Sequence, residues 1–113
     1  MNKTEAGFHL LVLLSLADDQ MQRAETGVVL DFLEKHFSEP IDLIKEQAFL
    51  RALPREERHN HFLEVAAQFY RISAPEERHA ITKFAMDVVM SDAHMQTHEN
   101  ALINELYNAW DLE

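Results

Sequence analysis

The sequence predicts an all-α protein, a compact bundle of about six helices with an internal repeat. The chain is 47% hydrophobic with only two glycines and three prolines, which is typical of an ordered, helix-rich domain. Its apolar residues recur at helical spacing, and no segment alternates apolar and polar residues long enough to predict a strand. The two ends of the chain also carry the same pattern, and such self-similarity indicates a duplicated structural unit.

The repeat relates residues 14–25, LSLADDQMQRAE, to residues 88–99, VVMSDAHMQTHE. Shifting the first copy so that position 18 falls on position 92 aligns four identical pairs: Asp18 with Asp92, Met21 with Met95, Gln22 with Gln96 and Glu25 with Glu99. An apolar run precedes each copy and helical apolar spacing follows it. Each copy is therefore predicted to be a helix, a short acidic turn and a helix. Two such hairpins about a pseudo-twofold axis would make one domain over residues 1–113.

The N-terminal hairpin comprises the first two predicted helices. Residues 3–17 are apolar on nearly all sides, as expected for a helix in the middle of a bundle. After the turn at residues 18–22, the second helix covers residues 23–37. Its predicted inner face consists of Val28, Val29, Phe32, Leu33 and His36.

Prolines mark the helix starts in the middle of the chain, because proline is tolerated in a first turn and not in a helix interior. Pro40 precedes a third helix at residues 41–53, and Pro54 opens a fourth at residues 55–72. The third carries an apolar stripe of Ile41, Ile44, Ala48 and Leu50. The fourth carries Phe62, Val65, Ala66, Phe69 and Ile72.

The C-terminal hairpin comprises the last two predicted helices. Ser73 and Glu76 fit a capping box, in which each side chain bonds the backbone amide of the other. A fifth helix should therefore run from there to about residue 90, with a stripe of Ile81, Phe84, Ala85 and Val88. After the second turn, the sixth helix covers residues 97–110, with a stripe of Leu102, Ile103, Leu106, Tyr107 and Trp110.

Charge and composition exclude several functions. A formal net charge of −10 repels nucleic-acid phosphate and anionic lipid, so neither nucleic-acid nor membrane binding is expected. The absence of cysteine excludes disulfides, thiolate catalysis and cysteine zinc sites. The apolar run at residues 8–17 is about half the length of a membrane-spanning helix. It also makes a poor signal peptide, because Glu5 offsets Lys3 and His9 interrupts the run; a cytoplasmic protein is expected.

The two acidic turns are the candidate site. Within each hairpin, a spacing of seven residues places the turn aspartate opposite a glutamate of the next helix: Asp18 with Glu25, and Asp92 with Glu99. Converging carboxylates repel one another, and a divalent cation relieves that repulsion through oxygen ligands. The second turn also contains two imidazoles, those of His94 and His98, which could extend the site toward zinc or nickel. The expected cofactor is a divalent ion: calcium, magnesium, manganese or zinc.

A purely structural role explains the same acids and stays open as an alternative. Glu25 and Glu99 fall in first helical turns, where a carboxylate satisfies free amides and the macrodipole, and aspartate is ordinary in turns. The turns are not EF-hands. Counted from Asp18 or Asp92, the sixth residue is not glycine and the twelfth is not glutamate, as a calcium loop requires.

In both copies an apolar helix ends in Ala-Asp or Ser-Asp, and then come two residues, an apolar residue and an acidic first helical turn. Over about residues 8–37 and 81–110 this order resembles the TerB family of tellurite-resistance proteins, and the related domain ahead of some DnaJ-type co-chaperones. The resemblance implies an all-helical fold with an internal repeat, no catalytic activity, and turn acids that bind a divalent metal. The chain departs from the family pattern at Asp19 and Ala93, where glycine is usual, and at Gln22 and Gln96.

Two other sets of residues bear on function. Glu-x-x-His occurs at Glu56–His59 and Glu76–His79, the spacing of di-iron bundles, but di-iron ligands project inward from mid-helix and these lie in predicted first turns. His9 and His36 are expected to pack on helix faces, and no motif indicates nucleophilic catalysis.

We therefore expect a non-enzymatic stress or scaffold domain that docks a protein partner. The alternatives are an interaction module without a metal and a di-iron enzyme, and a homodimer stays open.

Overall fold

The computed structural model describes residues 1–16, 23–91, 105–106 and 108–110, and within these residues every regular element is a helix. The helices are α1 (Lys3–Leu16), α2 (Arg23–His36), α3 (Leu43–Ala52), α4 (Arg55–Ile72) and α5 (Pro75–Ser91). The all-α prediction is confirmed, with five such helices in place of about six. The predicted sixth helix falls mostly outside the described residues, although residues 105, 106, 108 and 109 are helical.

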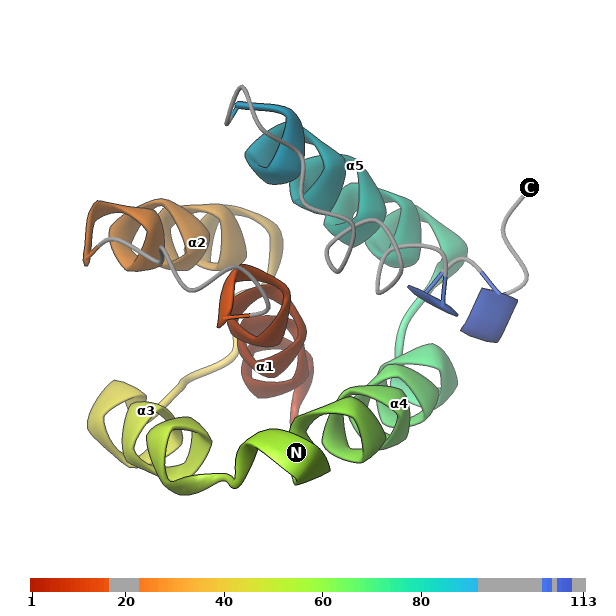
Figure 1. Cartoon of the computed structure of the whole chain (residues 1–113). Coiled ribbons are helices and arrows are strands. Elements are labelled where there is room, and N and C mark those ends of the chain that lie inside the picture. Colours follow the sequence, from red (N-terminus) through yellow and green to blue (C-terminus); the bar gives the residue numbers. More distant parts are fainter. Residues whose placement is uncertain (17–22, 92–104, 107, 111–113) are drawn as a thin grey trace.

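Helix α1 is the centre of the bundle (Figure 1). Its side chains from Phe8 to Leu14 are all buried, and each of the other four helices packs against it. A helix without a polar face is stable only when its neighbours surround it, so the predicted central position is confirmed. The radius of gyration is 12.8 Å, close to the roughly 13 Å of a compact chain of this length.

Gly7 allows α2 and α5 to approach α1 closely. A Cβ atom at this position would lie 2.8 Å from Leu33 Cδ2 on α2 and 3.3 Å from Ile81 Cδ1 on α5. The outer helices also touch each other, because the rings of Phe32 on α2 and Phe84 on α5 stack with centroids 4.2 Å apart. Among the described helices, none is long and apolar enough to cross a membrane.

Side chains satisfy the free amides at two of the helix starts. At α1, Asn2 Oδ1 accepts a hydrogen bond from Glu5 N–H at 2.8 Å, and Glu5 Oε1 accepts one from Asn2 N–H at 2.9 Å. This reciprocal pair is a capping box with asparagine as the cap. At α3, the Asp42 carboxylate accepts a hydrogen bond from Lys45 N–H at 3.2 Å.

The predicted capping box at α5 is wrong by one residue. Pro75 is the first helical residue, a position that proline favours, so Ala74 precedes the helix and Glu77 is its third residue. Glu77 Oε1 accepts a hydrogen bond from Ala74 N–H at 2.7 Å. The Ser73 hydroxyl donates instead to the carbonyl of Phe69.

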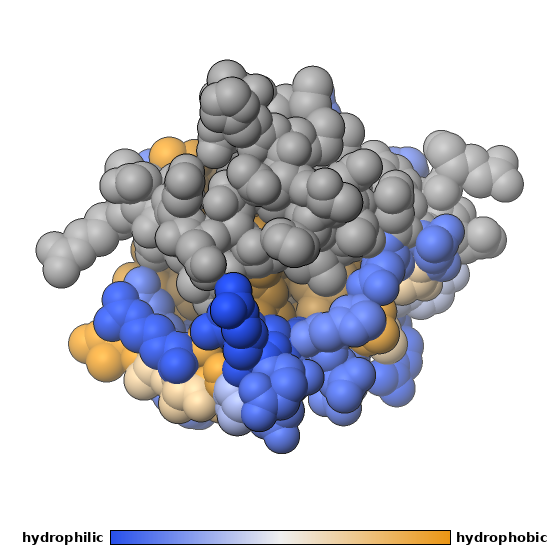
Figure 2. Space-filling model, in the orientation of Figure 1, coloured by the Kyte–Doolittle hydropathy of each residue, from blue (hydrophilic) through white to orange (hydrophobic). Residues whose placement is uncertain are grey.

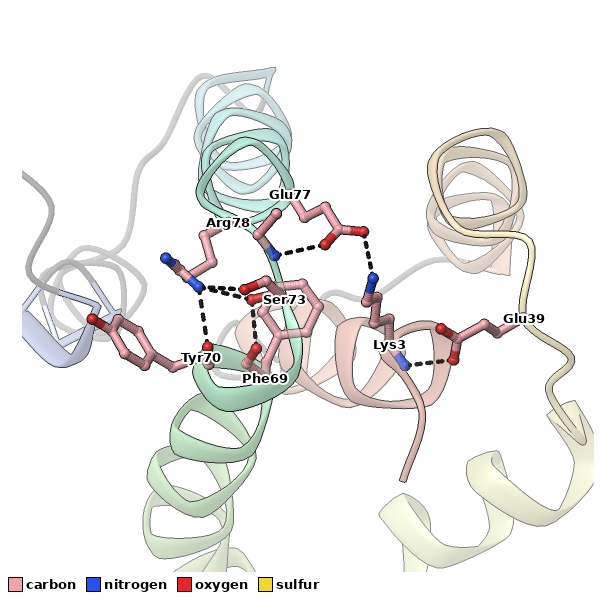
Figure 3. Close-up of polar contacts among 8 residues, drawn as sticks. Lys3, Glu39, Phe69, Tyr70, Ser73, Glu77 and Arg78 are labelled. Atoms are coloured by element: carbon pink, nitrogen blue, oxygen red, sulfur yellow. Dashed lines mark hydrogen bonds and ion pairs between the residues drawn. The ribbon is translucent and has the colours of Figure 1, made fainter.

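Lys3 connects the start of α1 to two distant segments (Figure 3). Its Nζ lies 3.0 Å from Glu77 Oε2 on α5, and its backbone N–H donates to Glu39 Oε2 at 3.0 Å. Burial by itself would raise the pKa of Glu77. The hydrogen bond from Ala74, with the charges of Lys3 and Arg78, outweighs burial and lowers that pKa below its usual value.

Arg78 fixes the corner between α4 and α5 (Figure 3). Its Nη1 donates to the carbonyls of Tyr70 at 3.0 Å and Ser73 at 2.7 Å. The guanidinium also lies 4.3 Å from the centre of the Tyr70 ring, a cation–π geometry. The last turn of α4 and the first turn of α5 are thus held by one side chain.

The predicted inner faces of two helices need correction. Among the α2 side chains that the structure describes, from residue 27 onward, Val29, Leu33 and, directly after the helix, Phe37 are buried, whereas Val28 and His36 are exposed. A helix that packs mainly on one neighbour buries a narrow stripe at i, i+4 and i+8.

On α3 the buried residues are Glu46 and Leu50, whereas Ile44 and Ala48 are exposed. The helix is therefore rotated away from the predicted orientation. On α4 the prediction is confirmed at Phe62, Val65, Ala66 and Phe69, and Ile72 at its end is exposed.

Candidate functional site

The predicted metal ligands all lie outside the residues whose side chains are described. Asp18, Asp92, His94, His98 and Glu99 are not described at all, and Glu25 is placed in the first turn of α2 only through its backbone. The structure describes the helix that precedes each turn, α1 as far as residue 16 and α5 as far as residue 91. The convergence of the two turns stays a prediction.

The described residues contain a different polar cluster, a buried chain that joins α3, α1 and α4. Glu46 Oε2 lies 3.1 Å from His9 Nε2, and His9 Nδ1 lies 2.8 Å from His61 Nε2. His9 is 1% exposed, and the side chain of Glu46 is 10% exposed. Because His9 lies in the middle of the central helix, both of its ring nitrogens need partners from other helices.

Hydrogen-bond chemistry assigns the protons along this chain. A carboxylate only accepts, so His9 donates from Nε2 to Glu46. A neutral His9 then accepts at Nδ1, and His61 donates from Nε2. These tautomers follow from the acceptor chemistry of the network.

Phe49 of α3 covers the two imidazoles. Its ring stacks on His9 with centroids 5.6 Å apart and an interplanar angle of 27°, and it lies 5.2 Å from the centroid of His61. Phe49 is itself 47% exposed, so one side of the ring contacts the histidines and the other meets solvent. The Phe49 ring therefore covers the histidine pair and limits the access of water to the two imidazoles.

The environment of His61 makes folding depend on pH. Burial, and next the nearby His9, lower the pKa of His61 below its ordinary value of 6.5, and the opposing effects of Glu64 and Glu46 are smaller. Between the lowered pKa and 6.5 the unfolded chain therefore binds more protons than the folded one. The contribution of His61 to stability is complete above pH 6.5 and is lost as the pH falls through its folded pKa.

We expect the free energy of unfolding to decrease as the pH is lowered from 7.5 to 5.5. The decrease should be smaller for the His61→Gln variant. Glutamine can still donate to His9 Nδ1 but does not titrate. Urea denaturation at several pH values measures the difference between the two proteins. An identical pH dependence in wild type and variant would contradict the assignment to His61.

Sequence reasoning missed Glu46 and His61 as members of a site, and treated His9 as a packing residue. The burial of His9 is confirmed, but its hydrogen bonds were not anticipated. Its partners lie 37 and 52 residues away in the chain, so no local spacing connects them. The available signal was a histidine inside an apolar run, because a buried imidazole requires hydrogen-bond partners.

The Glu-x-x-His motifs do not form a di-iron arrangement. Glu56, His59, Glu76 and His79 are all exposed in the first turns of α4 and α5, whereas di-iron ligands face the interior of a bundle. His59 Nε2 instead lies 2.7 Å from Glu105 Oε2 at the surface. Elsewhere in the described part of the chain, no three His, Asp or Glu side chains are grouped to hold a metal ion.

Comparison with known families agrees with this all-helical structure. The model of the family described as tellurite resistance protein TerB matches residues 4–113. The chain belongs to the TerB family. The TerB match spans both predicted hairpins and the two helices between them, and so confirms the resemblance inferred from the repeated sequence pattern. No match was found among curated proteins or solved structures.

Proposed function

We propose that this TerB protein is a non-enzymatic, cytoplasmic scaffold domain that binds a divalent cation at its two acidic turns and docks a protein partner. The observation that carries the proposal is the duplicated Asp–Glu spacing within a chain that the TerB family model matches over residues 4–113. The proposed ligands are Asp18, Glu25, Asp92 and Glu99, with His94 and His98 near the second pair.

The sequence positions of the turn acids support a cation at these turns. Asp18 and Asp92 follow α1 (Lys3–Leu16) and α5 (Pro75–Ser91) in the chain, and each lies seven residues before a glutamate. Carboxylates that converge repel one another unless a cation compensates their charge. In Figure 1 the orange start of α2 and the blue end of α5 face the same left-hand side of the view.

Titration calorimetry with calcium, magnesium, manganese and zinc tests the cation site. We expect at least one ion to give a binding heat, and the double variant Asp18→Asn/Asp92→Asn to weaken that binding more than tenfold with a much smaller change in unfolding free energy. Removing two ligand charges weakens the coordination of a hard cation.

The matched control is Glu56→Gln/Glu76→Gln, which removes the same charge from exposed first turns. Equal weakening in the control would mean that general charge, not a site, attracts the ion. If no ion gives a heat, the cation half of the proposal fails and an interaction module without a metal is left.

That second candidate, an interaction module without a metal, has an observation of its own. Ile44 on α3 is 82% exposed, and Phe49 on the same helix is 47% exposed. Large apolar side chains gathered on one outer helix are typical of a surface that contacts another molecule.

A further inference from the structure

Helix α3 carries apolar side chains on its outer face as well as on its inner face. It buries Leu50, and the carboxylate of Glu46 against His9, and turns Ile44, Ala48 and Ala52 outward, all of them exposed. Burial of a carboxylate is costly without a partner. The rotation of α3 is therefore fixed both by the apolar burial of Leu50 and by the bond between Glu46 and His9.

The outward face of α3 forms a continuous apolar stripe. Residues 44, 48 and 52 follow one another at helical i, i+4 and i+8 positions on the side opposite Glu46 and Leu50, and Phe49 lies along one edge. Figure 2 shows an orange and beige patch over α3 at the lower left, with blue residues beside it. Because the two alanines have short side chains, the backbone of another helix can approach this part of the stripe closely.

The charged side chains of α3 itself that flank this stripe are positive, in contrast to the protein as a whole. Lys45 and Arg51 are exposed on its two sides, and the one acidic residue within α3, Glu46, points inward. The complete chain has a formal net charge of −10. The outward face of α3 is therefore a local basic border around an apolar centre on an acidic molecule.

We propose that the outward face of α3, made by Ile44, Ala48 and Ala52 between Lys45 and Arg51 with Phe49 at one edge, docks an amphipathic helix of a partner protein whose apolar stripe is edged by acidic residues. A stripe at i, i+4 and i+8 presents the ridge that helix-to-helix packing uses. Acidic edges on the partner would pair with the two cations. This inference rests on the scaffold half of the proposed function and is independent of the cation.

Charge argues against a second copy as the occupant of this face. A second copy packed symmetrically, α3 against α3, would bring Lys45 and Arg51 together with their own duplicates, and like charges across an interface are unfavourable. An acidic amphipathic helix instead places opposite charges beside these two cations, and binding to an anionic membrane is an outcome of the test.

A designed helical peptide, with leucines along one face and glutamates on both edges, tests the proposal by fluorescence anisotropy. The titrations contain EDTA, so that the result does not depend on the divalent site. We expect saturable binding to the full chain, and about tenfold or greater weakening by Ile44→Ser. A peptide of the same design with lysines at the edges should bind at least tenfold more weakly, and a scrambled peptide should not bind.

Two control variants keep the result interpretable. Val28→Ser removes another exposed β-branched residue, 52% exposed on α2, and should leave binding unchanged. Lys45→Glu/Arg51→Glu should abolish binding, whereas Lys35→Glu/Lys83→Glu changes the net charge equally at exposed positions elsewhere and should not. Thermal melts establish that each variant is folded.

Three outcomes would overturn the proposal. One is equal binding of the acidic-edged and lysine-edged peptides. The second is dimerisation in sedimentation equilibrium that Ile44→Ser abolishes, which would assign the face to a second copy. The third is co-sedimentation with phosphatidylglycerol vesicles in place of peptide binding, which would assign it to a membrane. None of these results bears on the cation site, which calorimetry tests separately.

Discussion

Replacing His9 with alanine is expected to lower the free energy of unfolding by about 3–5 kcal/mol. His9 is 1% exposed in the central helix and bonds both Glu46 and His61. Its removal leaves a cavity and also a buried carboxylate without its donor, and these two costs add. A domain of this size is stable by roughly 5–15 kcal/mol, so much of that stability would be lost. Urea denaturation followed by circular dichroism measures the change.

Two further variants separate the causes of that loss. His79→Ala removes an exposed histidine from α5 and should change stability by less than about 0.5 kcal/mol. The double variant His9→Leu/Glu46→Leu replaces both partners with apolar groups and should recover a large part of the loss, since no buried charge is then unpaired. A His9→Ala protein as stable as wild type would contradict the buried chain.

Replacing Trp110 with alanine is expected to destabilise the protein by about 3–5 kcal/mol. Trp110 is 2% exposed, and its Nε1–H donates to the carbonyl of Ala66 on α4 at 2.7 Å. Its ring also lies 5.3 Å from that of Phe69. This one side chain thus joins the C-terminal end of the chain to α4. Because the chain contains one tryptophan, the variants must be followed by circular dichroism and not by fluorescence.

Trp110→Phe is the matched control, because it keeps an aromatic ring and removes the indole donor. We expect it to cost about 1–2 kcal/mol, clearly less than the alanine variant, from one lost hydrogen bond and the smaller ring. If both variants were as stable as wild type, the contact between Trp110 and α4 would not exist in solution.

Much of the fold could be predicted from the sequence, because the sequence signals that indicate helices are local. The all-round apolar character of residues 8–16 predicted a central helix, and the structure places α1 in the middle. Prolines predicted the starts of α4 and α5 to within a residue. Helical spacing also selected four of the buried residues of α4 correctly: Phe62, Val65, Ala66 and Phe69.

The errors arose where a tertiary interaction outweighed a local preference. On α3 the apolar pattern favoured Ile44 and Ala48 as the inner face, but Glu46 is buried because His9 offers it a buried partner. The burial of Glu46 could not be recognised from the sequence of α3 alone, since its partner His9 is on another helix. On α2, Val28 is exposed and Phe37 is buried, because α1 covers only a narrow stripe of this helix.

The sequence by itself determined the helical class, the repeated Asp–Glu pattern and the TerB family, because periodicity, prolines and short motifs are properties of neighbouring residues. Only the tertiary structure decided which polar groups meet. A hydrogen bond between His9 and residues 37 or 52 positions away exists only after three helices have packed. The same packing decided that α3 turns its apolar stripe toward solvent, because burying Glu46 beside His9 leaves Ile44 on the outside.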